Sequence, residues 1–442
     1  MEADSLLVIG IVVVLYAAVA RRLDSTPISG PMVFVGLGVL LGTDGLGWLE
    51  ADLSNSTITG LVEATLAVVL FSDASRVDLA NLRKHWSLPG RLLTIGLPLA
   101  IGLGMLAGML LLPNGAWQAA LLAGIMLAPT DAALGQAVVT DRSVPVYVRQ
   151  GLNVESGLND GLALPVFEAG IAIAVAGFSA SGASNVVRVL FEEVVFGTIA
   201  GVVVGLVAGP LLSRARRAGW TGRHWHGLAT LGITAAAYGL AVTIGGNPFI
   251  AAFAAGLAYR PSVDLPMADD VSHDFAELLT MLAFIVFGAI VLGPNLSAFD
   301  WRIAVYAVLS LTVVRGLAVV ISLLGSRNRW PTVGFIAWFG PRGIASVLYS
   351  FLLLEEAEQI PFAAEVVDVV MFTVALSVLL HGMSASWLAR LYGMWFTDME
   401  EEHEEMVEST EVHEHSLGRC ADPAGEAASK RVHEPPSDAH HL

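Results

Sequence analysis

Charged side chains are scarce in this chain, since Asp, Glu, Lys and Arg make up only 14% of its 442 residues. A soluble domain typically carries about a quarter of its residues as charged side chains. Hydrophobic residues instead make up 55% of the sequence. Apolar runs of about 20 residues, long enough to cross a bilayer, recur along the chain. The composition therefore predicts an all-α polytopic membrane protein whose partners include the lipid bilayer.

Cysteine and basic residues are also few. The single cysteine, Cys420, cannot form a disulfide within the chain. No basic residue precedes the first apolar run, and Arg21 and Arg22 follow it, so this run is predicted to be a membrane span rather than a signal peptide. Acidic residues outnumber basic ones by 40 to 23, and many of them lie in the C-terminal tail, so we expect no nucleic-acid partner.

Apolar runs separated by Gly, Pro and charge clusters predict about thirteen transmembrane helices. Two groups of six helices joined by one linking helix would lie in the membrane in opposite orientations, which is the inverted-repeat architecture of secondary transporters. The predicted spans lie near residues 5–20, 28–43, 58–75, 92–112, 117–139, 145–177, 186–212, 226–244, 247–259, 276–292, 301–324, 332–354 and 363–390.

The distribution of Lys and Arg between the loops predicts the orientation. Cytoplasmic loops carry an excess of basic residues, and the loops after odd-numbered spans are the basic ones here. The opposite loops contain only Arg188 and Arg302. We therefore expect the N-terminus outside and the C-terminus in the cytoplasm. The cytoplasmic set is Arg21, Arg22, Arg76, Arg83, Lys84, Arg91, Arg142, Arg149, Arg214, Arg216, Arg217, Arg223, Arg260, Arg327 and Arg329.

Two predicted spans are interrupted at corresponding positions, the fifth of each group of six. Span 117–139 contains Pro129, Thr130 and Asp131, and span 332–354 contains the run Gly-Pro-Arg-Gly around Arg342. Such interruptions are tolerated in a membrane where they line a protein-lined, wet cavity, and they point to a transporter's midplane site. The broken ends carry partial charges, which Asp131 could neutralise at N-termini and Arg342 at C-termini.

The span 145–177 carries polar residues in an otherwise apolar stretch. A charged side chain at the bilayer centre costs roughly 2.5–3.5 kcal/mol on insertion scales, so such residues are functional candidates. Ser156 and Asp160 are four residues apart and share one face of a helix. Their hydroxyl and carboxylate oxygens are suited to a hard cation. Glu168, two turns further on, could line the pore or lie near the membrane surface.

A neighbouring face of the same span carries Glu155 and Asn159. Glu155 needs a partner, and Arg315 is one of only two basic residues placed well inside a span. We interpret Glu155 and Arg315 as a structural ion pair rather than as transport residues. We expect Glu63 and Asp73, in span 58–75, to lie near the two membrane faces with structural roles.

Other classes of membrane protein have less support. A channel needs a selectivity filter, and no TVGYG-like loop is present. A hydrolase needs a nucleophile and a base. His381, which lies well inside a predicted span, has no obvious serine partner, although Asp131 and Asp160 could superficially resemble a protease dyad. We therefore expect a transporter and not an enzyme.

The motifs APTDAALG, ESGLNDG and FGPRG, in this order and with the arginine of the eleventh span, resemble the cation:proton antiporter superfamily, specifically its NhaP-type sodium/proton exchanger branch. The resemblance covers residues 1 to about 392. It implies a homodimer whose core domain moves against a dimerisation domain. The implied division is 1–86 dimerisation, 87–180 core, 181–217 linker helix, 218–295 dimerisation and 296–392 core. The polar, acidic composition of residues 393–442 predicts a disordered, histidine-containing cytoplasmic tail.

The resemblance also implies roles for individual residues. Asp160, Ser156 and Thr130 would hold the transported cation, with Asp131 nearby. The pair Asn159–Asp160 is similar to the electroneutral branch, which exchanges one cation per proton, whereas electrogenic relatives carry two adjacent aspartates. We expect cation and proton to compete for Asp160 in the cell membrane, with no cofactor.

The resemblance further implies a structural pair of Glu155 and Arg315, and places Arg342 at the helix crossing. Span 332–354 departs from the GLRG-like version of animal exchangers, which leaves Na⁺ (or Li⁺) versus K⁺ open. K⁺/H⁺ exchange by the same fold is therefore the main alternative to Na⁺/H⁺ exchange, and a cation channel is a weaker one.

Overall fold

The computed structural model describes most of the predicted membrane region, and Cys420 and the tail beyond residue 402 lie outside it. The basic residues Arg83, Lys84 and Arg260 lie outside it as well. Apart from an isolated bridge between Gly42 and Leu49, the described residues are helices and their connections. The structure describes residues 3–23, 26–49, 56–77, 86–112, 116–131, 134–139, 141–176, 180–259, 268–357 and 359–402.

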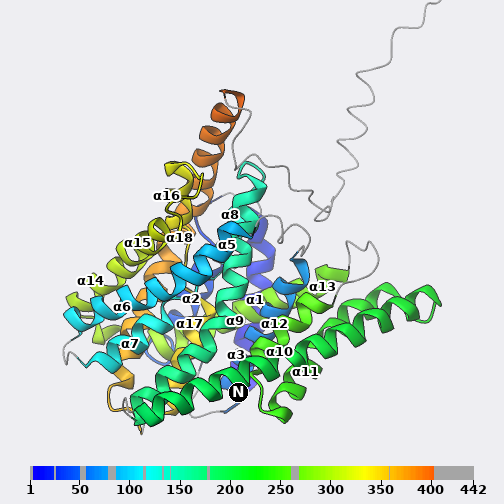
Figure 1. Cartoon of the computed structure of the whole chain (residues 1–442), viewed down its shortest axis with the longest axis horizontal. Helices are drawn as coiled ribbons and strands as arrows, with labels where there is room; N and C mark the ends of the chain where they lie inside the picture. The colour runs from blue at the N-terminus through cyan, green and yellow to red at the C-terminus, as the bar shows by residue number, and fades with distance from the viewer. Residues whose placement is uncertain are drawn as a thin grey trace, which may run out of the picture.

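Helices fall on every apolar run of the sequence (Figure 1). In the first half these are α1 (Ala3–Leu23), α2 (Gly30–Leu41), α3 (Ser56–Arg76), α5 (Ser87–Arg91), which continues through a π-helical turn into α6 (Leu97–Leu111), α7 (Trp117–Met126), α8 (Gln136–Val139), α9 (Val146–Ala176) and α10 (Ala180–Arg217). In the second half they are α11 (Arg223–Ile244), α12 (Pro248–Ala258), α13 (Ala268–Val286), α14 (Trp301–Leu309), α15 (Arg315–Ser322), α16 (Trp330–Trp338), α17 (Ile344–Glu355) and α18 (Ala363–Glu402).

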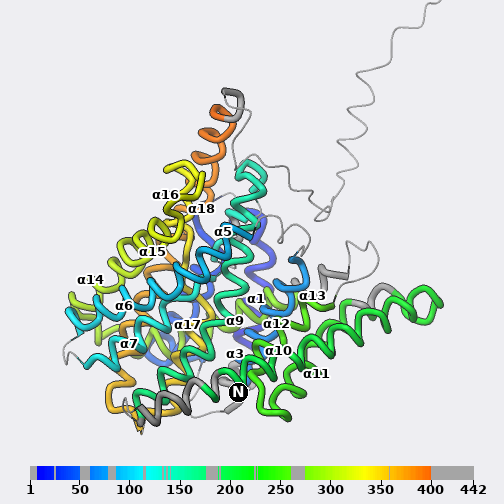
Figure 2. Tube along the Cα trace, in the orientation of Figure 1, coloured from blue at the N-terminus to red at the C-terminus, as the bar shows by residue number. Residues whose placement is uncertain are grey.

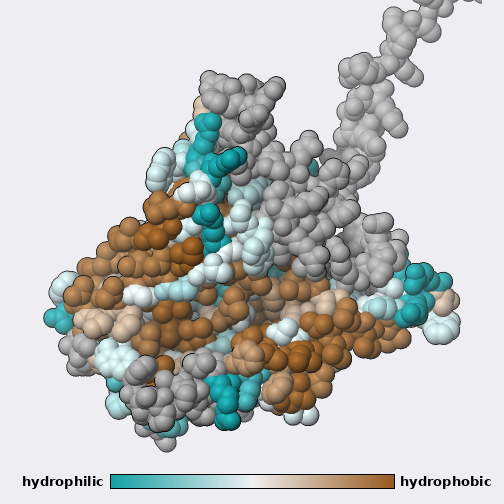
Figure 3. Space-filling model, in the orientation of Figure 1, coloured by the Kyte–Doolittle hydropathy of each residue, from teal (hydrophilic) through white to brown (hydrophobic). Residues whose placement is uncertain are grey.

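Seven helical stretches of the described chain are long and apolar enough to cross a membrane, by length and composition alone. Four shorter apolar helices, among them α7 and α17, lie beside them. On the face seen in Figure 3, hydrophobic residues form a broad band, and hydrophilic residues lie mainly above and below it. The protein is thus an all-helical, multi-pass membrane protein. The count of thirteen crossings and the inverted repeat stay predictions.

The helices pack as two groups with α9 between them, as the trace in Figure 2 shows. In one group, α12 packs against α3, α10 and α11, and α13 packs against α2 and α3. In the other, α7 packs against α6, α18 packs against α14 and α17, and α16 packs against α15. Helix α9 contacts α3, α10 and α12 on one side and α7 on the other. The division into dimerisation and core domains stays a prediction.

Small residues bring α7 close to α6. Gly104 faces Gly124, and a Cβ added at Gly124 would lie 2.7 Å from the carbonyl oxygen of Ile101. Gly108 faces Ala120 in the next turn. Close approach of backbones through small residues is the usual way in which membrane helices associate. This contact fixes α7, and with it the interrupted segment that follows α7.

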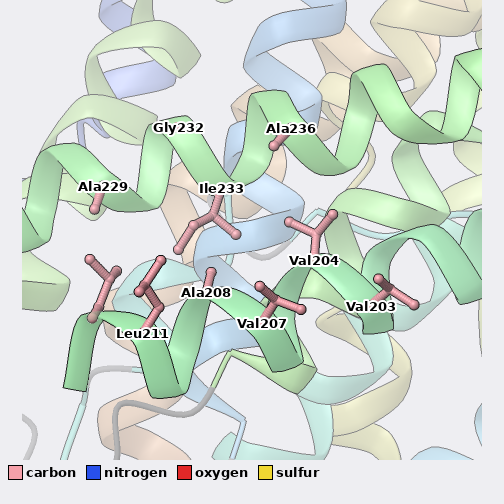
Figure 4. Close-up of a pocket in the computed structure, with 10 residues that line it drawn as sticks. Val203, Val204, Val207, Ala208, Leu211, Ala229, Gly232, Ile233 and Ala236 are labelled. Carbon is pink, nitrogen blue, oxygen red and sulfur yellow. The ribbon is translucent and has the colours of Figure 1, made fainter. Parts of the chain in front are cut away.

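A surface groove runs between α10 and α11 (Figure 4). The groove is lined by aliphatic side chains and a glycine, so its lining has no side-chain oxygen or nitrogen that could bind an ion or a proton. Exposed apolar surface of this kind suits lipid chains or another apolar helix. The residues that line it include Val203, Val204, Val207, Leu211, Ile233 and Ala236.

Candidate ion-binding site at the crossing of two broken helices

Two interrupted helices meet inside the protein. Helix α7 ends at Met126, and residues 127–131 leave the helical conformation. Helix α16 ends at Trp338, and α17 begins only at Ile344. The backbone N–H of Asp131 donates to the carbonyl of Pro341 over 2.8 Å, so the two interruptions touch directly. Breaks at mid-helix expose backbone groups, which need partners from the protein.

Asp131 and Arg342 supply those partners at ends of opposite polarity. The carboxylate of Asp131 accepts from the backbone N–H of Ile344, the first residue of α17, over 2.8 Å. The guanidinium of Arg342 donates to the carbonyls of Gly340 at 2.9 Å and Pro129 at 3.3 Å. An acidic group therefore lies at a helix N-terminus and a basic group beside carbonyl ends, the arrangement that helix dipoles favour.

Helix α9 holds the α7 interruption through Thr130. Asn159 donates from its side-chain nitrogen to the hydroxyl of Thr130 over 2.7 Å, and its oxygen accepts from the backbone N–H of Thr130 over 3.3 Å. Ser156 donates its hydroxyl to the carbonyl of Thr130 over 2.5 Å. All three residues are buried. Their oxygen atoms form a cluster at the part of α9 that carries Asp160.

Asp160 is the carboxylate of this cluster that has an unused oxygen. The residue is 8% exposed, and its Oδ1 has no hydrogen-bond partner among the described residues. Its backbone carbonyl accepts from the hydroxyl of Tyr349 over 3.3 Å. Asp131 and Asp73 are the carboxylates that act on it electrostatically. A buried carboxylate in this situation is stabilised by a proton or a cation, because an unpaired buried charge is costly.

Glu155 and Arg315 form an ion pair on the neighbouring face of α9. The two terminal guanidinium nitrogens of Arg315, Nη1 and Nη2, donate to the two carboxylate oxygens of Glu155 over 2.5 and 2.9 Å. Both side chains are buried. Arg315 also reaches the carbonyl of Ile336 in α16, at 3.5 Å. The pair therefore links α9, α15 and α16.

Of the predicted set, Thr130 is hydrogen-bonded to Ser156 and Asn159, and Asp131 lies at the same interruption. Asp160 follows Ser156 by one turn of α9 and lies within electrostatic reach of Asp131. Arg342 lies at the crossing, and Glu155 lies with Arg315.

Asp73 and His381 have contacts that the sequence analysis does not predict. Asp73, which the sequence predicts near a membrane face with a structural role, has its Cβ 3.8 Å from the Cβ position of Gly157 on α9, and its charge acts on Asp160. The packing of α3 against α9, which no local pattern reveals, brings it there. The sequence predicts no serine partner for His381, but its Nδ1 lies 3.1 Å from the hydroxyl of Ser377. The four-residue spacing of these two residues is the signal that could have revealed the pair.

A family model described as "Sodium/hydrogen exchanger, transmembrane" matches residues 8–391. The chain belongs to this family. Among curated proteins, this family member is 27% identical over 403 residues to "K(+)/H(+) antiporter NhaP2" of Shewanella oneidensis, covering 88% of this chain and 68% of that protein. It is 25% identical over 364 residues to "Probable Na(+)/H(+) antiporter C3A11.09" of Schizosaccharomyces pombe, covering 74% of this chain but only 47% of that protein.

A solved structure shares the fold of this family member. The sodium proton antiporter MjNhaP1 from Methanocaldococcus jannaschii superposes with a TM-score of 0.74 at 19% identity. The superposition covers 88% of this chain and 98% of the archaeal protein. The likeness therefore extends over nearly the whole described membrane region.

Proposed function

We propose that this protein exchanges a monovalent cation for a proton across the membrane, and that Asp160 accepts either of the two. The observation that carries the proposal is the buried Oδ1 of Asp160, which has no hydrogen-bond partner in the described part of the chain and lies on the same helix as Ser156 and Asn159. Membership of the sodium/hydrogen exchanger family supports it. A buried carboxylate without a partner is an expensive arrangement in a purely structural role.

The oxygen donors around Asp160 fit a hard monovalent cation. Ser156 and Thr130 contribute hydroxyl oxygens, and Thr130 also contributes a carbonyl. Such neutral and anionic oxygen ligands suit hard cations. Asn159 fixes Thr130, so that the donors are arranged before the cation arrives. Asp131 contributes negative charge nearby while it caps α17.

Coupling follows from competition at one carboxylate. Ionised Asp160 binds the cation, and protonated Asp160 does not. Either loaded form leaves the site close to neutral, whereas a bare carboxylate is costly to move through an apolar barrier. The site therefore changes sides only when it is loaded, and no ATP is needed. With Asn159 in place of a second aspartate, one cation is exchanged for one proton, so the cycle is electroneutral.

The transport cycle proposed here is alternating access in a homodimer, with α9 and the crossing helices moving against the α3, α12 and α13 side. The N-terminus lies outside and the C-terminus in the cytoplasm, and the exchanger serves pH homeostasis at the cell membrane. Na⁺ or Li⁺ is the cation that we favour. K⁺ is the second candidate, because a relative that matches most of this chain carries the name K(+)/H(+) antiporter.

Purified protein in proteoliposomes with a pH-sensitive dye tests the proposal. We expect addition of Na⁺, Li⁺ or K⁺ to dissipate an imposed proton gradient, and the relative rates identify the substrate. Asp160→Asn should remain folded and show no exchange. Glu63→Gln is a matched acid-to-amide control, since Glu63 is engaged with the hydroxyl of Tyr238 at 3.1 Å and should keep exchange. Normal exchange by Asp160→Asn would refute the assignment, and cation current without proton movement would favour a channel.

A further inference from the structure

Helix α18 carries a polar stripe against the end of α16 that the exchange mechanism above does not use. The backbone N–H of Arg342 donates to the hydroxyl of Ser377 over 2.7 Å. His381 Nε2 lies 2.9 Å from the carbonyl of Trp338, the last residue of α16. The indole N–H of Trp338 donates to Ser384 over 3.0 Å. The three α18 residues are spaced by four and three positions, so they share one face of that helix.

The hydrogen bonds of this stripe form a continuous chain from one side of the interruption to the other. The acceptor of the Arg342 N–H is the Ser377 oxygen. That hydroxyl can in turn donate to Nδ1 of His381, at 3.1 Å. Nε2 of His381 can donate only to the carbonyl of Trp338. The Trp338 carbonyl can only accept, so Nε2 carries a proton. Nδ1 lies 3.1 Å from the hydroxyl and 3.0 Å from the backbone carbonyl of Ser377, so it accepts from the hydroxyl when the imidazole is neutral and donates to the carbonyl when the imidazole is charged.

The chain acts on the backbone that aims Arg342 into the crossing. Arg342 is fully buried, and two of its guanidinium nitrogens, Nε and Nη2, have no hydrogen-bond partner among the described residues. Its position therefore depends on the carbonyls of Pro129 and Gly340 and on the backbone bond to Ser377. Loss of that bond would free the segment that also contacts Asp131.

We propose that His381 is a positioning residue for exchange: with its proton on Nε2 it fixes the carbonyl end of α16 and the hydroxyl of Ser377, and through them the backbone of Arg342. This inference rests on the proposed exchange activity. A proton on Nδ1 would turn that nitrogen from an acceptor of the Ser377 hydroxyl into a donor to the Ser377 carbonyl at 3.0 Å, so the hydroxyl would lose this acceptor. The charged groups that act on His381 are Arg342 from the interruption and Arg315 from α15, the latter paired with Glu155.

Two effects of acid on exchange then become separable. Protons that compete at Asp160 raise the cation concentration needed for half-maximal exchange, and saturating cation restores the rate. A proton on His381 loosens the crossing itself, so it lowers the maximal rate and saturating cation does not restore it.

The test measures maximal exchange rate and half-saturating Na⁺ concentration in proteoliposomes as the pH is lowered stepwise from neutral, with K⁺ substituted if Na⁺ is not transported. His381→Ala and Ser377→Ala should each lower the maximal rate about tenfold, the effect expected from one lost buried hydrogen-bond network, with half-saturation nearly unchanged. His381→Gln can still donate an amide N–H to the Trp338 carbonyl but cannot take up a proton. This variant should keep the maximal rate. It should lose the acid inhibition that persists in the wild-type protein at saturating cation.

Thr373→Val is the matched control on the same helix, because the buried hydroxyl of Thr373 bonds only the carbonyl of Val369 one turn away. It should leave both kinetic constants and the pH profile unchanged. A wild-type rate in His381→Ala, or a His381→Gln variant with the wild-type acid inhibition at saturating cation, would overturn the inference. If His381→Ala does not fold, the Gln and Ser377 variants decide. Wild-type protein without any exchange would instead refute the proposed function.

Discussion

The buried pair of Glu155 and Arg315 allows a sharp prediction about stability. The two bonds of 2.5 and 2.9 Å join side chains that are only 3% and 6% exposed, so removal of either residue leaves the other charge stranded in an apolar environment. Breaking a buried pair in this way costs about 3–5 kcal/mol. Glu155→Ala and Arg315→Ala should therefore each lower the melting temperature of the detergent-solubilised protein by many degrees.

The double variant separates a stranded charge from lost packing. Glu155→Ala/Arg315→Ala removes both charges together, so it should be less destabilised than the sum of the two single variants. The exposed pair Arg188–Glu192, with nitrogen and oxygen 4.0 Å apart and side chains 67% and 47% exposed, is the matched control. Arg188→Ala should cost no more than about 1 kcal/mol.

Thermal unfolding followed by fluorescence or by loss of the monodisperse elution peak measures these differences. A single variant of the buried pair that melts with the wild-type protein would refute the structural role. A Glu155→Ala variant that is fully stable yet inactive in exchange would move Glu155 into the transport site.

Three further changes probe the crossing. Asp131→Ala should destabilise the protein by about 0.5–2 kcal/mol, because α17 loses the acceptor at its N-terminus. Asp131→Asn should be less destabilised, because its amide oxygen can still accept, and equal melting temperatures of the two variants would contradict this. Asn159→Asp removes the donor to Thr130, so it should lower stability by about 1–3 kcal/mol and slow exchange. An unchanged exchange rate with an unchanged melting temperature would argue against that role. Asp73→Asn should change cation affinity without abolishing exchange, and complete loss of exchange would place Asp73 beside Asp160 as an obligatory ligand.

The interrupted helices could be predicted from sequence because Gly, Pro and a charge together inside a long apolar run are tolerated in a membrane mainly around a protein-lined cavity. The sign of each charge also predicts its place at the interruptions, with Asp131 at a helix N-terminus and Arg342 beside helix carbonyls, as helix dipoles favour. The same interruptions explain why the two broken spans are not among the seven stretches of the described chain that length and composition alone identify as crossing helices. Helices α7 and α17 are fragments of broken runs, and each is too short to qualify by itself.

Other parts of the site could not be obtained in this way. Asp73 comes to Asp160 through packing of α3 on α9, a contact between segments far apart in the sequence. The His381 chain joins α18 to the interruption between α16 and α17, and the sequence reveals only the spacing of His381 and Ser377. Backbone groups freed by a broken helix choose their partners in three dimensions, and the residue pattern alone does not identify them.

Proton release on cation binding tests the shared carboxylate most directly. When Na⁺ or K⁺ binds purified protein in weakly buffered detergent solution, at a pH where Asp160 is largely protonated, we expect release of about one proton per protein. Asp160→Asn should release none, and Glu63→Gln should behave as the wild-type protein. Cation binding by the wild-type protein without proton release, or equal release by Asp160→Asn, would contradict competition at this residue.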